Sequence, residues 1–476
     1  MSRALIWLRR DLRLHDHPAM RLALCRGEAP IFLYLHAPEE EAPWPPGAAS
    51  LVWLDRSLRS LQADLRARGS DLLIARGPSL PALLSVAQQA EVVSVYWQRR
   101  YEPAVIARDA VVKRDLRVAG LQAESVKGAV LFEPWEVQTG QGGPYKVFTP
   151  FWRNAQTRLA DVVTTDAPEA LPAPPAGLAA SSLSVDDLGL VPRPRWDGGF
   201  WERFQPGERG AMNALEAFID GAAKGYRSQR DLPDRAGTSR LSAHLHFGEI
   251  SPQQIVTRLR SITWSAAAQN DVDGFVRELG WREFSQHLLY HFPHTTEENL
   301  NPQFSAFPWQ EDAQALAAWQ QGRTGVPIVD AGMRELWQTG WMHNRVRMLV
   351  ASFLTKHLRQ HWLHGARWFW DTLVDADLAN NTQGWQWTAG TGADAAPYFR
   401  IFNPATQAER FDPKGGYVRQ WLPELACLPD KALFAPWEHA DLLRRLAPDY
   451  PQRPIVDLRE GRELALVAYR NVSKQP

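Results

Sequence analysis

The sequence predicts an α/β domain followed by a larger all-helical domain, and three observations support this order. Short apolar runs alternate with helical stretches over the first 130 residues, which is typical of a parallel sheet. Residues 161–199 are rich in alanine, proline and serine, as in a connector. Apolar residues then recur at helical spacing to the end. We therefore expect an α/β domain over 1–130, an interdomain linker over 131–200 and a helical domain over 201–476.

The first domain is expected to have a Rossmann-like topology without its dinucleotide-binding loop. Residues 49–69 form an amphipathic pattern that ends at Gly69, as a helix would. The glycine-rich loop that would follow the first strand is replaced by "RRDLRLHDHP". The runs that predict strands are 4–8, 29–36, 71–77 and 91–97.

The second domain is expected to consist of helices. The ranges with the helical pattern are 211–226, 252–261, 272–291 and 347–365.

Composition describes an ordinary globular chain and excludes several classes of protein. The 476 residues include 53 basic and 53 acidic side chains, so a nucleic-acid or membrane partner is not indicated by bulk charge and would require a local patch. The two cysteines, Cys25 and Cys427, exclude a disulfide framework and a cysteine-based zinc site. No signal peptide or membrane-spanning stretch is recognisable, so we expect a cytoplasmic protein.

Tryptophan is unusually abundant, with 21 residues, and two of these stand in "GWQW" as Trp385 and Trp387. Such residues either fill a large helical core or act as stacking platforms and electron carriers. Glu278 and Trp281 lie one helical turn apart, so a carboxylate and an indole share a helix face. This pair suits a base-binding pocket as well as it suits a packed core.

Four local sequence patterns could belong to binding sites. "GTGADA" (390–395) matches the dinucleotide fingerprint but has no strand before it. "AGTSRLS" (236–242) offers hydroxyl and backbone N–H groups for a phosphate, or is a polar loop. Residues 341–370 hold five Lys/Arg, four His and no acidic residue, which favours a basic surface facing an anion such as DNA phosphate. His357 and His361 are spaced like metal ligands, but "HLRQH" lacks the metalloprotease glutamate, and we predict no metal site.

Several longer motifs resemble one known family. The motifs are "IWLRRDLRLHDHPA", "GGPYKVFTPFWR", "GTSRLSAHLHFGEISP", "LGWREF", "TGVPIVDAGMRELWQTGWMHNRVRM", "DADLANN…GWQW" and "DAAPYFRIFNP". They are spread nearly from end to end of the chain and are similar to those of DNA photolyases and cryptochromes, closest to the microbial cyclobutane pyrimidine dimer photolyases of class I and the related class III.

The resemblance implies an FAD cofactor, as FADH⁻ when active, in the helical domain. Asn381 matches the residue that faces flavin N5, where photolyases carry asparagine, plant cryptochromes typically aspartate and animal cryptochromes typically cysteine. Arg347 and Asp375 match an expected ion pair. The positions that match cofactor-binding residues are Tyr226, Thr238, Ser239, Arg240, Leu241, Ser242, Phe275, Glu278, Arg282, Asn344, Arg347, Asp375, Asp377 and Asn381.

The same resemblance implies light-driven repair of UV-damaged DNA by a monomeric lyase. Excited FADH⁻ would give an electron to a flipped-out pyrimidine dimer, and the electron would return after the cyclobutane ring splits. Trp385, Trp362 and Trp309 match an electron-transfer chain that photoreduces FAD. The matches to catalytic residues are Glu278, Asn381, Trp281 and Trp387, and those to DNA-binding residues are Arg230, Glu278, Trp281, Asn344, Arg345, Trp387 and Gln407.

Departures from the family pattern keep alternatives open. "YEPAVIARD" has Ala104 and Val105 where folate-binding relatives often carry Asn-Glu, so the antenna chromophore is of folate or deazaflavin type, or absent. The family also contains (6-4) photolyases, whose usual histidine pair is reduced here to His343 in "MHNRVRM". A third alternative is a non-catalytic blue-light receptor of the cryptochrome type. Asn381 and the lesion-pocket residues favour repair.

Overall fold

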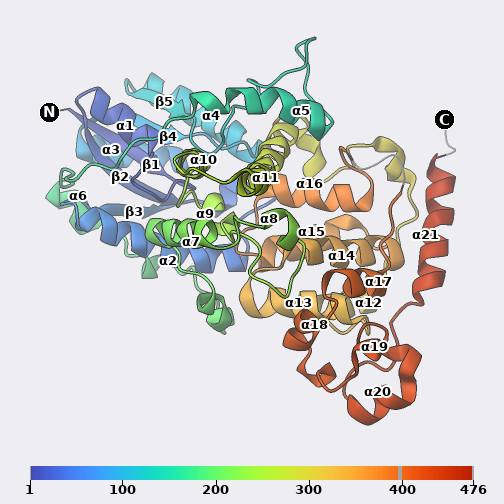
Figure 1. The fold of residues 1–476 in the computed structure, drawn as a ribbon. Coiled ribbons are helices and arrows are strands. Elements are labelled where there is room, and N and C mark those ends of the chain that lie inside the picture. Colours follow the sequence, from blue (N-terminus) through green and yellow to red (C-terminus); the bar gives the residue numbers. More distant parts are fainter. Residues whose placement is uncertain (1, 395–398, 474–476) are drawn as a thin grey trace.

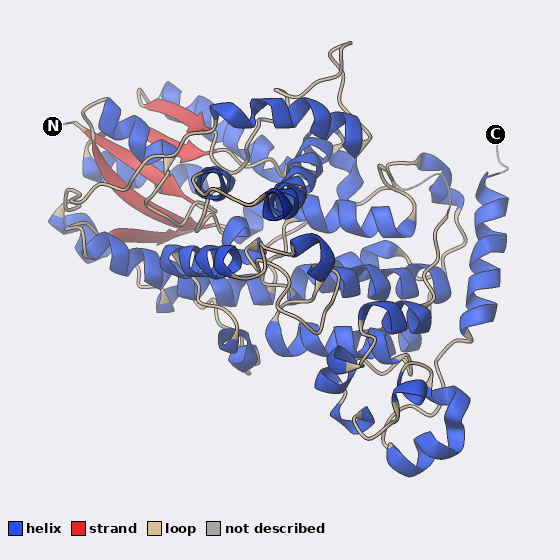
Figure 2. Cartoon of the chain, viewed as in Figure 1, coloured by secondary structure: helices blue, strands red, loops and turns tan. Residues whose placement is uncertain are grey.

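The computed structural model describes residues 2–394 and 399–473. Figure 1 shows the N-terminal part around a sheet at one end of the molecule, with helices of the later sequence filling the rest. The strands are confined to that end (Figure 2). The predicted fold class, an α/β domain followed by a helical one, is confirmed.

The sheet is parallel and has the strand order β3-β2-β1-β4-β5. This is the order of a Rossmann-like sheet, with the reversal between β1 and β4. The four predicted strands are present, and a fifth is added at the edge, where only Ala123 is fully buried and the hydrophobic signal is therefore weak. The bounds are β1 Arg3–Leu8, β2 Ala29–His36, β3 Leu72–Arg76, β4 Val92–Gln98 and β5 Gln122–Val126.

Helices cover both faces of this sheet. Alternate residues of β1 point to opposite sides, so Ile6 packs with α1 and α2 while Trp7 packs with α3 and α4. Both sets are fully buried, which explains why the strands read as continuous apolar runs. The bounds are α1 Pro18–Cys25, α2 Ala48–Arg66, α3 Ser79–Ala90 and α4 Pro103–Val118.

The segment between the two domains contains short helices, of which α5 packs on the helical domain. α5 (Phe148–Ala155) contributes Phe148 and Phe151 to the core that contains Phe284 of α11 (Ala266–His291). α6 (Ala176–Ser181) lies on the sheet domain instead, where Leu178 is buried. Residues 131–200 therefore touch both domains.

The remaining helices form the second domain. No helix in the described ranges is long and apolar enough to span a bilayer. Their bounds are α7 Glu208–Asp220, α8 Tyr226–Gln229, α9 Ser242–His246, α10 Pro252–Arg260, α11 Ala266–His291, α12 Ala313–Gln320, α13 Pro327–Thr339, α14 Asn344–Ser352, α15 Trp362–Thr372, α16 Leu378–Ala389, α17 Pro404–Phe411, α18 Gly416–Trp421, α19 Asp430–Leu433, α20 Ala440–Leu446 and α21 Leu458–Ser473.

The helix expected over 347–365 is interrupted, so this prediction was wrong in detail. A π-helical turn over Phe353–His357 follows α14, and Arg359 then adopts a positive φ of 52°. His361 caps α15 by accepting the backbone N–H of Leu363, which gives the chain a local alternative to continuing one helix. The apolar spacing runs through the break, so periodicity alone did not reveal it.

The two domains share a core, which fixes the sheet relative to the helices. Trp53 of α2 is fully buried, stacks with Phe247 at 6.1 Å between centroids and donates its indole N–H to Glu249 at 3.0 Å. Where α2 begins, Gly47 packs so closely on the backbone of Trp370 that a Cβ would lie 2.3 Å from its oxygen. Any site between the domains therefore has rigid walls.

Candidate functional site

A cavity of about 440 Å³ opens in the helical domain and is lined by residues of α11, α14 and α16. Its volume lies in the range of ligand and cofactor sites. It gathers eleven of the predicted site residues. These are Arg230, Glu278, Trp281, Asn344, Arg345, Arg347, Asp375, Asp377, Asn381, Trp385 and Trp387.

Helix α16 forms one wall of the cavity, and both of its ends are fixed by caps. Asp377 caps its start by accepting the backbone N–H of Asn380 at 2.9 Å, and Gly390 ends it with a φ of 84°. Asn381, one turn in, donates its side-chain amide to the carbonyl of Ala366 at 2.9 Å. The amide of Asn381 is thereby held against the cavity wall.

Trp385 lies on the inner side of α16, in contact with α15. A Cβ on Gly365 would lie 2.0 Å from its ring, so only glycine allows this approach. Trp362 lies one turn from Gly365 on α15, is fully buried and donates its indole N–H to Asn299 at 2.9 Å. The predicted first and second electron carriers therefore both lie at the contact between α15 and α16, one helical turn of α15 apart.

Between Trp362 and Trp309 lies His361, which the sequence analysis considered only as a metal ligand. The ring of His361 lies 5.6 Å from that of Trp362 and 5.1 Å from that of Trp309. Burial lowers the pKa of His361 to about 4, so the ring is neutral at pH 7. Trp309 is partly exposed. Aromatic rings thus lead from the cavity wall outward.

Trp387 and Trp281 face the cavity from α16 and α11. Trp387 donates its indole N–H to the carbonyl of Asp394 at 3.1 Å. Trp281 stacks on Phe148 of α5 with centroids 3.7 Å apart and planes 9° apart, and Phe148 stacks in turn on Trp152 at 6.3 Å. Phe148 and Trp152 were quoted in the motif "GGPYKVFTPFWR" but not assigned a role.

Charged side chains at the rim are held in pairs. Glu278 forms an ion pair with Arg230, whose guanidinium lies 5.3 Å from the ring centre of Tyr226. Burial alone would lower the pKa of Arg230, but the neighbouring carboxylate of Glu278 raises it above its ordinary value. Arg345 forms a second pair, 2.8 Å from Asp231, a residue that the sequence analysis missed although it follows Arg230 directly.

The expected pair of Arg347 and Asp375 is present, with N–O distances of 3.1 and 2.8 Å. The side chain of Asp375 is almost fully buried, and that of Arg347 is about one quarter exposed. Arg347 also donates to the carbonyl of Met342 at 2.8 Å. Asp377 accepts from Gln286 at 3.1 Å. The polar side of the cavity is therefore rigid.

The other predicted residues lie outside the cavity lining. Tyr226 and Phe275 pack on each other at 5.4 Å behind Arg230. Arg282 donates to the carbonyl of Ala129 at 2.8 Å. Gln407 lies half-buried on α17. The loop 236–242 supplies the rest, Thr238, Ser239, Arg240, Leu241 and Ser242, of which Leu241 is buried and Arg240 has a φ of 54°.

The basic surface expected from residues 341–370 is not made of free charges: four of its five basic side chains are buried or paired, and Arg359 is half-buried. Lys356 is buried and donates to the carbonyl of Ala389 at the end of α16. Arg367 pairs with Glu297, 2.8 Å away, and bonds to a backbone carbonyl. Arg345 and Arg347 are paired as described. The sequence could not show this pairing, because the acidic partners of these basic residues lie in other segments of the chain.

Histidines of this segment serve local structure. His343 caps α14 by accepting the backbone N–H of Arg345 at 3.2 Å, and burial lowers its pKa to about 4. His357 stacks on Phe353 at 5.6 Å. No cluster of three or more potential metal-binding side chains occurs within residues 2–394 and 399–473.

The "GTGADA" segment has no strand–turn–helix setting. Gly390 ends α16 and Gly392 follows in a turn, so a dinucleotide-binding loop is excluded for the described part of it. Ala395, which ends the segment, and residues 395–398 of the "DAAPYFRIFNP" motif lie outside the described residues.

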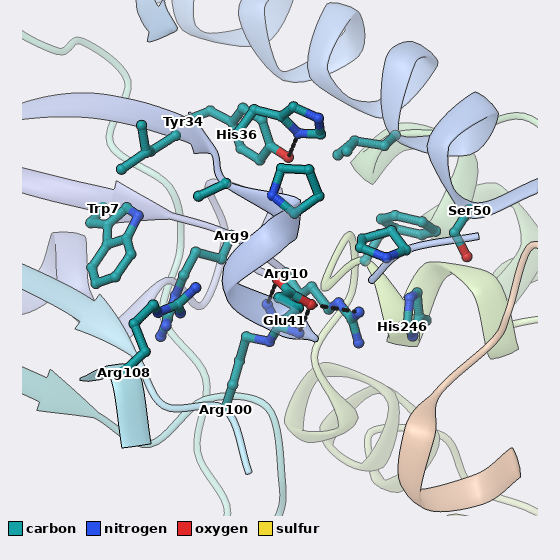
Figure 3. A pocket seen from close by; sticks show the side chains of 16 residues that line it. Trp7, Arg9, Arg10, Tyr34, His36, Glu41, Ser50, Arg100, Arg108 and His246 are labelled. Atoms are coloured by element: carbon teal, nitrogen blue, oxygen red, sulfur yellow. Dashed lines mark hydrogen bonds and ion pairs between the residues drawn. The ribbon is translucent and has the colours of Figure 1, made fainter. Parts of the chain in front are cut away.

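A second, smaller pocket of about 40 Å³ lies at the carboxyl edge of the sheet, and we call it the sheet-edge pocket (Figure 3). Arg10 and Arg100 converge on Glu41 there, and Arg100 also pairs with Glu102 at 2.9 Å. Although burial alone would raise it, Arg100 and Arg10 lower the pKa of Glu41 to about 2. Tyr34 and His36 of β2 form the opposite side of the pocket (Figure 3).

Comparison with known proteins identifies the family. Residues 4–175 match the model described as DNA photolyase, and residues 275–471 match the FAD binding domain of DNA photolyase. The chain is 45% identical over 475 residues to the deoxyribodipyrimidine photo-lyase of Agrobacterium fabrum, covering 99% of this chain and 98% of the relative. It is 37% identical to cryptochrome-2 of Arabidopsis thaliana, covering 97% of this chain and 78% of the relative.

A solved structure agrees with these relatives. The crystal structure of a bacterial class III photolyase from Agrobacterium tumefaciens matches with a TM-score of 0.93 and 44% identity, covering 100% of this chain and 98% of that one. The chain therefore belongs to the DNA photolyase and cryptochrome family, which confirms the resemblance found in the motifs. The helical domain is the FAD-binding domain of this family, and the family acts on DNA.

The side chains that line the cavity have the chemistry that a flavin requires. Amide, carboxylate and guanidinium groups stand on one side, and Phe369, Leu373 and Met348 line it with apolar atoms. Arg345 leaves its buried Nε without a hydrogen-bond partner, and a Cβ on Gly384 would meet no atom within 4 Å. A planar heteroaromatic ring with polar edges matches this lining.

Proposed function

We propose that this protein is a light-driven lyase that repairs cyclobutane pyrimidine dimers in DNA. One observation carries the proposal: Glu278, Trp281 and Trp387 line the same cavity as Asn381, Arg347 and Asp375. The first set suits two linked pyrimidine bases, and the second suits a flavin. Substrate and cofactor would therefore be neighbours.

FAD binding would use the polar side of the cavity and the loop before α9. Asn381, Asp375 and Arg347 would orient the ring, because each is already held by its own partner. Loop 236–242 would hold the phosphates, and Tyr226, Phe275 and Arg282 would support it from behind. When bound, reduced FAD supplies the photoexcited electron that opens the cyclobutane ring and takes it back.

The lesion would enter by flipping out of the duplex, which costs less for a dimer that stacks poorly. Trp281 and Trp387 would stack on the two bases, while Glu278 would accept their N–H donors. Arg230, Arg345, Asn344 and Gln407 would contact the DNA near the opening. The ion pair between Arg230 and Glu278 must loosen for Glu278 to reach the lesion.

Photoreduction of the flavin would use Trp385, Trp362 and Trp309 in that order. Trp385 lines the cavity, Trp362 is buried and Trp309 is partly exposed, so the hole would move from the interior to the solvent. Asn299 accepts the indole N–H of Trp362 without being able to take its proton.

An antenna chromophore would occupy the sheet-edge side of the N-terminal domain. Val105 is fully buried and Ala104 lines a neighbouring hollow, so neither provides a polar group for folate in the usual class I manner. A deazaflavin, or a folate held differently, is consistent with the arginines there. The protein would act as a monomer in the cytoplasm.

The test is repair of two oligonucleotides by the reduced protein, one with a cyclobutane thymine dimer and one with a (6-4) product. Light-dependent restoration of thymines from the cyclobutane dimer alone is expected. Repair of the (6-4) product would identify the other photolyase type. No repair of either, with FAD bound and photoreducible, would make the protein a receptor of the cryptochrome type.

A further inference from the structure

A separate hollow of about 300 Å³ lies where α5, the start of α8 and α11 meet, and we call it the α5–α11 groove. Three of its residues belong to the motif "GGPYKVFTPFWR", to which the sequence analysis assigned no role. It is lined by Thr149, Trp152, Arg153, Gln156, Arg227, Asp273 and Arg277.

The groove is positively charged, with three guanidinium groups and one carboxylate. Arg153, Arg227 and Arg277 are exposed, and among the described residues none of their guanidinium groups forms an ion pair, although Asp271 accepts the backbone N–H of Arg227 at 3.0 Å. At the cavity, by contrast, Arg230 and Arg345 each have an acidic partner. Unpaired guanidinium groups gathered in one hollow are available to an external anion.

Specific contacts hold the groove in shape, as the position of Arg227 shows. Its Nε donates to the carbonyl of Asn270 at 2.7 Å, near the start of α11. A Cβ on Gly274 would lie 2.9 Å from that Nε, so the arginine side chain packs closely against this turn of α11 and a larger residue at 274 would displace it. The terminal nitrogens of the guanidinium are left for a ligand.

An aromatic ladder joins the groove to the cavity. Trp152 lines the groove, Trp281 lines the cavity and Phe148 stacks between them, with steps of 6.3 and 3.7 Å. Arg277 is one turn from Trp281 on α11 and lies 5.3 Å from the ring centre of Phe148. Since one DNA strand rises about 3.4 Å per nucleotide, the groove lies a few nucleotides from a flipped lesion.

We propose that the α5–α11 groove binds the sugar–phosphate backbone of the DNA that flanks the lesion, through Arg153, Arg227 and Arg277. This inference rests on the proposed function, because it assumes that a lesion occupies the cavity. The contact is independent of sequence: it adds affinity and sets the register of the strand. A free phosphate or mononucleotide offers the same anion but cannot also occupy the cavity.

The test compares two charge-matched triple variants of the FAD-loaded protein. One is Arg153→Gln/Arg227→Gln/Arg277→Gln, and the control is Arg323→Gln/Arg444→Gln/Arg445→Gln, whose arginines are exposed and lie on or near α12 and α20, far from α5 (Figure 1). Dissociation constants for a duplex with one cyclobutane dimer are measured in the dark from 50 to 200 mM salt.

The groove variant is expected to bind at least about tenfold more weakly at low salt, with a log–log salt slope that is smaller by about 2 to 3, since each phosphate contact contributes about 0.9. The control variant should keep the parent slope. A bare dimer dinucleotide, too short to reach the groove, should bind both variants and the parent equally. Arg→Lys replacement at the three groove positions should restore the slope, while FAD content and far-UV circular dichroism verify the fold.

Equal slopes for the parent and the groove variant would overturn the proposal, even if the parent repairs dimers. Competition by inorganic phosphate or a mononucleotide as strong as that by lesion-free DNA of equal phosphate concentration would also overturn it, because the groove would then be a small-anion site. Failure of the parent to repair any lesion would refute the proposed function instead. The two failures are therefore distinguishable.

Discussion

The sheet-edge pocket and the helical cavity use the same kinds of side chain in opposite ways. In the former, Arg10 and Arg100 meet Glu41 in the middle, and about 40 Å³ is left (Figure 3). In the latter, the ion pair of Arg347 and Asp375 stands at the side, and about 440 Å³ is left. Charged pairs therefore do not by themselves mark a ligand site: what matters is whether they fill the space or border it.

The largest expected loss of stability follows from breaking the ion pair that borders the cavity. Arg347→Gln leaves Asp375 buried and unpaired, which costs about 3–5 kcal/mol of the free energy of unfolding. FAD content should fall as well, because Arg347 lines the cavity. Urea unfolding and the flavin absorbance per chain measure the two effects.

The matching change in the other pocket is Arg100→Gln, which breaks the buried pairs with Glu41 and Glu102. A comparable loss of stability is expected, with FAD content unchanged. If both variants kept FAD equally well, Arg347 would not hold the cofactor.

Glu278→Ala should give a smaller effect, on repair alone. A hydrogen bond to a charged group contributes about 1.5–3 kcal/mol, so the yield of repair per absorbed photon should fall by about tenfold or more while FAD stays bound. Glu278→Gln keeps an acceptor and should lose less. An unchanged yield in Glu278→Ala would remove this carboxylate from the mechanism.

His357 belongs to neither pocket and gives a pH prediction. Burial, with a contribution from Arg462, lowers its pKa to about 4, from about 6.5 in the unfolded chain. The unfolded chain therefore binds more protons between pH 4 and 6.5, and the contribution of His357 to stability is lost as the pH falls through that window.

In His357→Gln the free energy of unfolding should depend less steeply on pH, by up to about 1.4 kcal/mol per pH unit. Urea unfolding at several pH values between 4.5 and 6.5 measures this slope in the parent and the variant. Parallel slopes would show that His357 titrates normally in the folded protein.

The smallest effect is expected at an exposed pair. Arg59 of α2 bonds to Asp55 and Asp186, but its side chain is 45% exposed. Arg59→Gln should lower the free energy of unfolding by less than about 1 kcal/mol, and high salt should reduce even that. A loss similar to that of Arg347→Gln would mean that burial does not set the difference between these pairs.

The fold class was predictable because its signals are local. β1 to β4 coincide with apolar runs, whereas β5, an edge strand with one fully buried side chain, gave no such signal. The break after α14 was missed because it depends on the cap at His361 and a positive φ at Arg359, while the apolar spacing continues. Caps of this kind are weak signals in a sequence.

The cavity was predictable only in part. Motifs named Glu278, Trp281, Asn381 and Trp387, and all four line it. Asp231 and the α5–α11 groove were missed because their significance depends on side chains brought together from distant segments. The pairing of the basic residues in 341–370 could not be predicted for the same reason, since Lys356 is buried against Ala389 and Arg345 pairs with Asp231.

The central claim is that α16 serves two functions, with Trp385 on the path of electrons and Trp387 on the wall of the lesion pocket. The most direct measurement is repair of a cyclobutane dimer oligonucleotide by Trp385→Phe, with and without prior chemical reduction of FAD. The account predicts full repair by the pre-reduced variant and none by the oxidised variant, which cannot be photoreduced. Photoreduction at the parent rate, or loss of repair after chemical reduction, would contradict it.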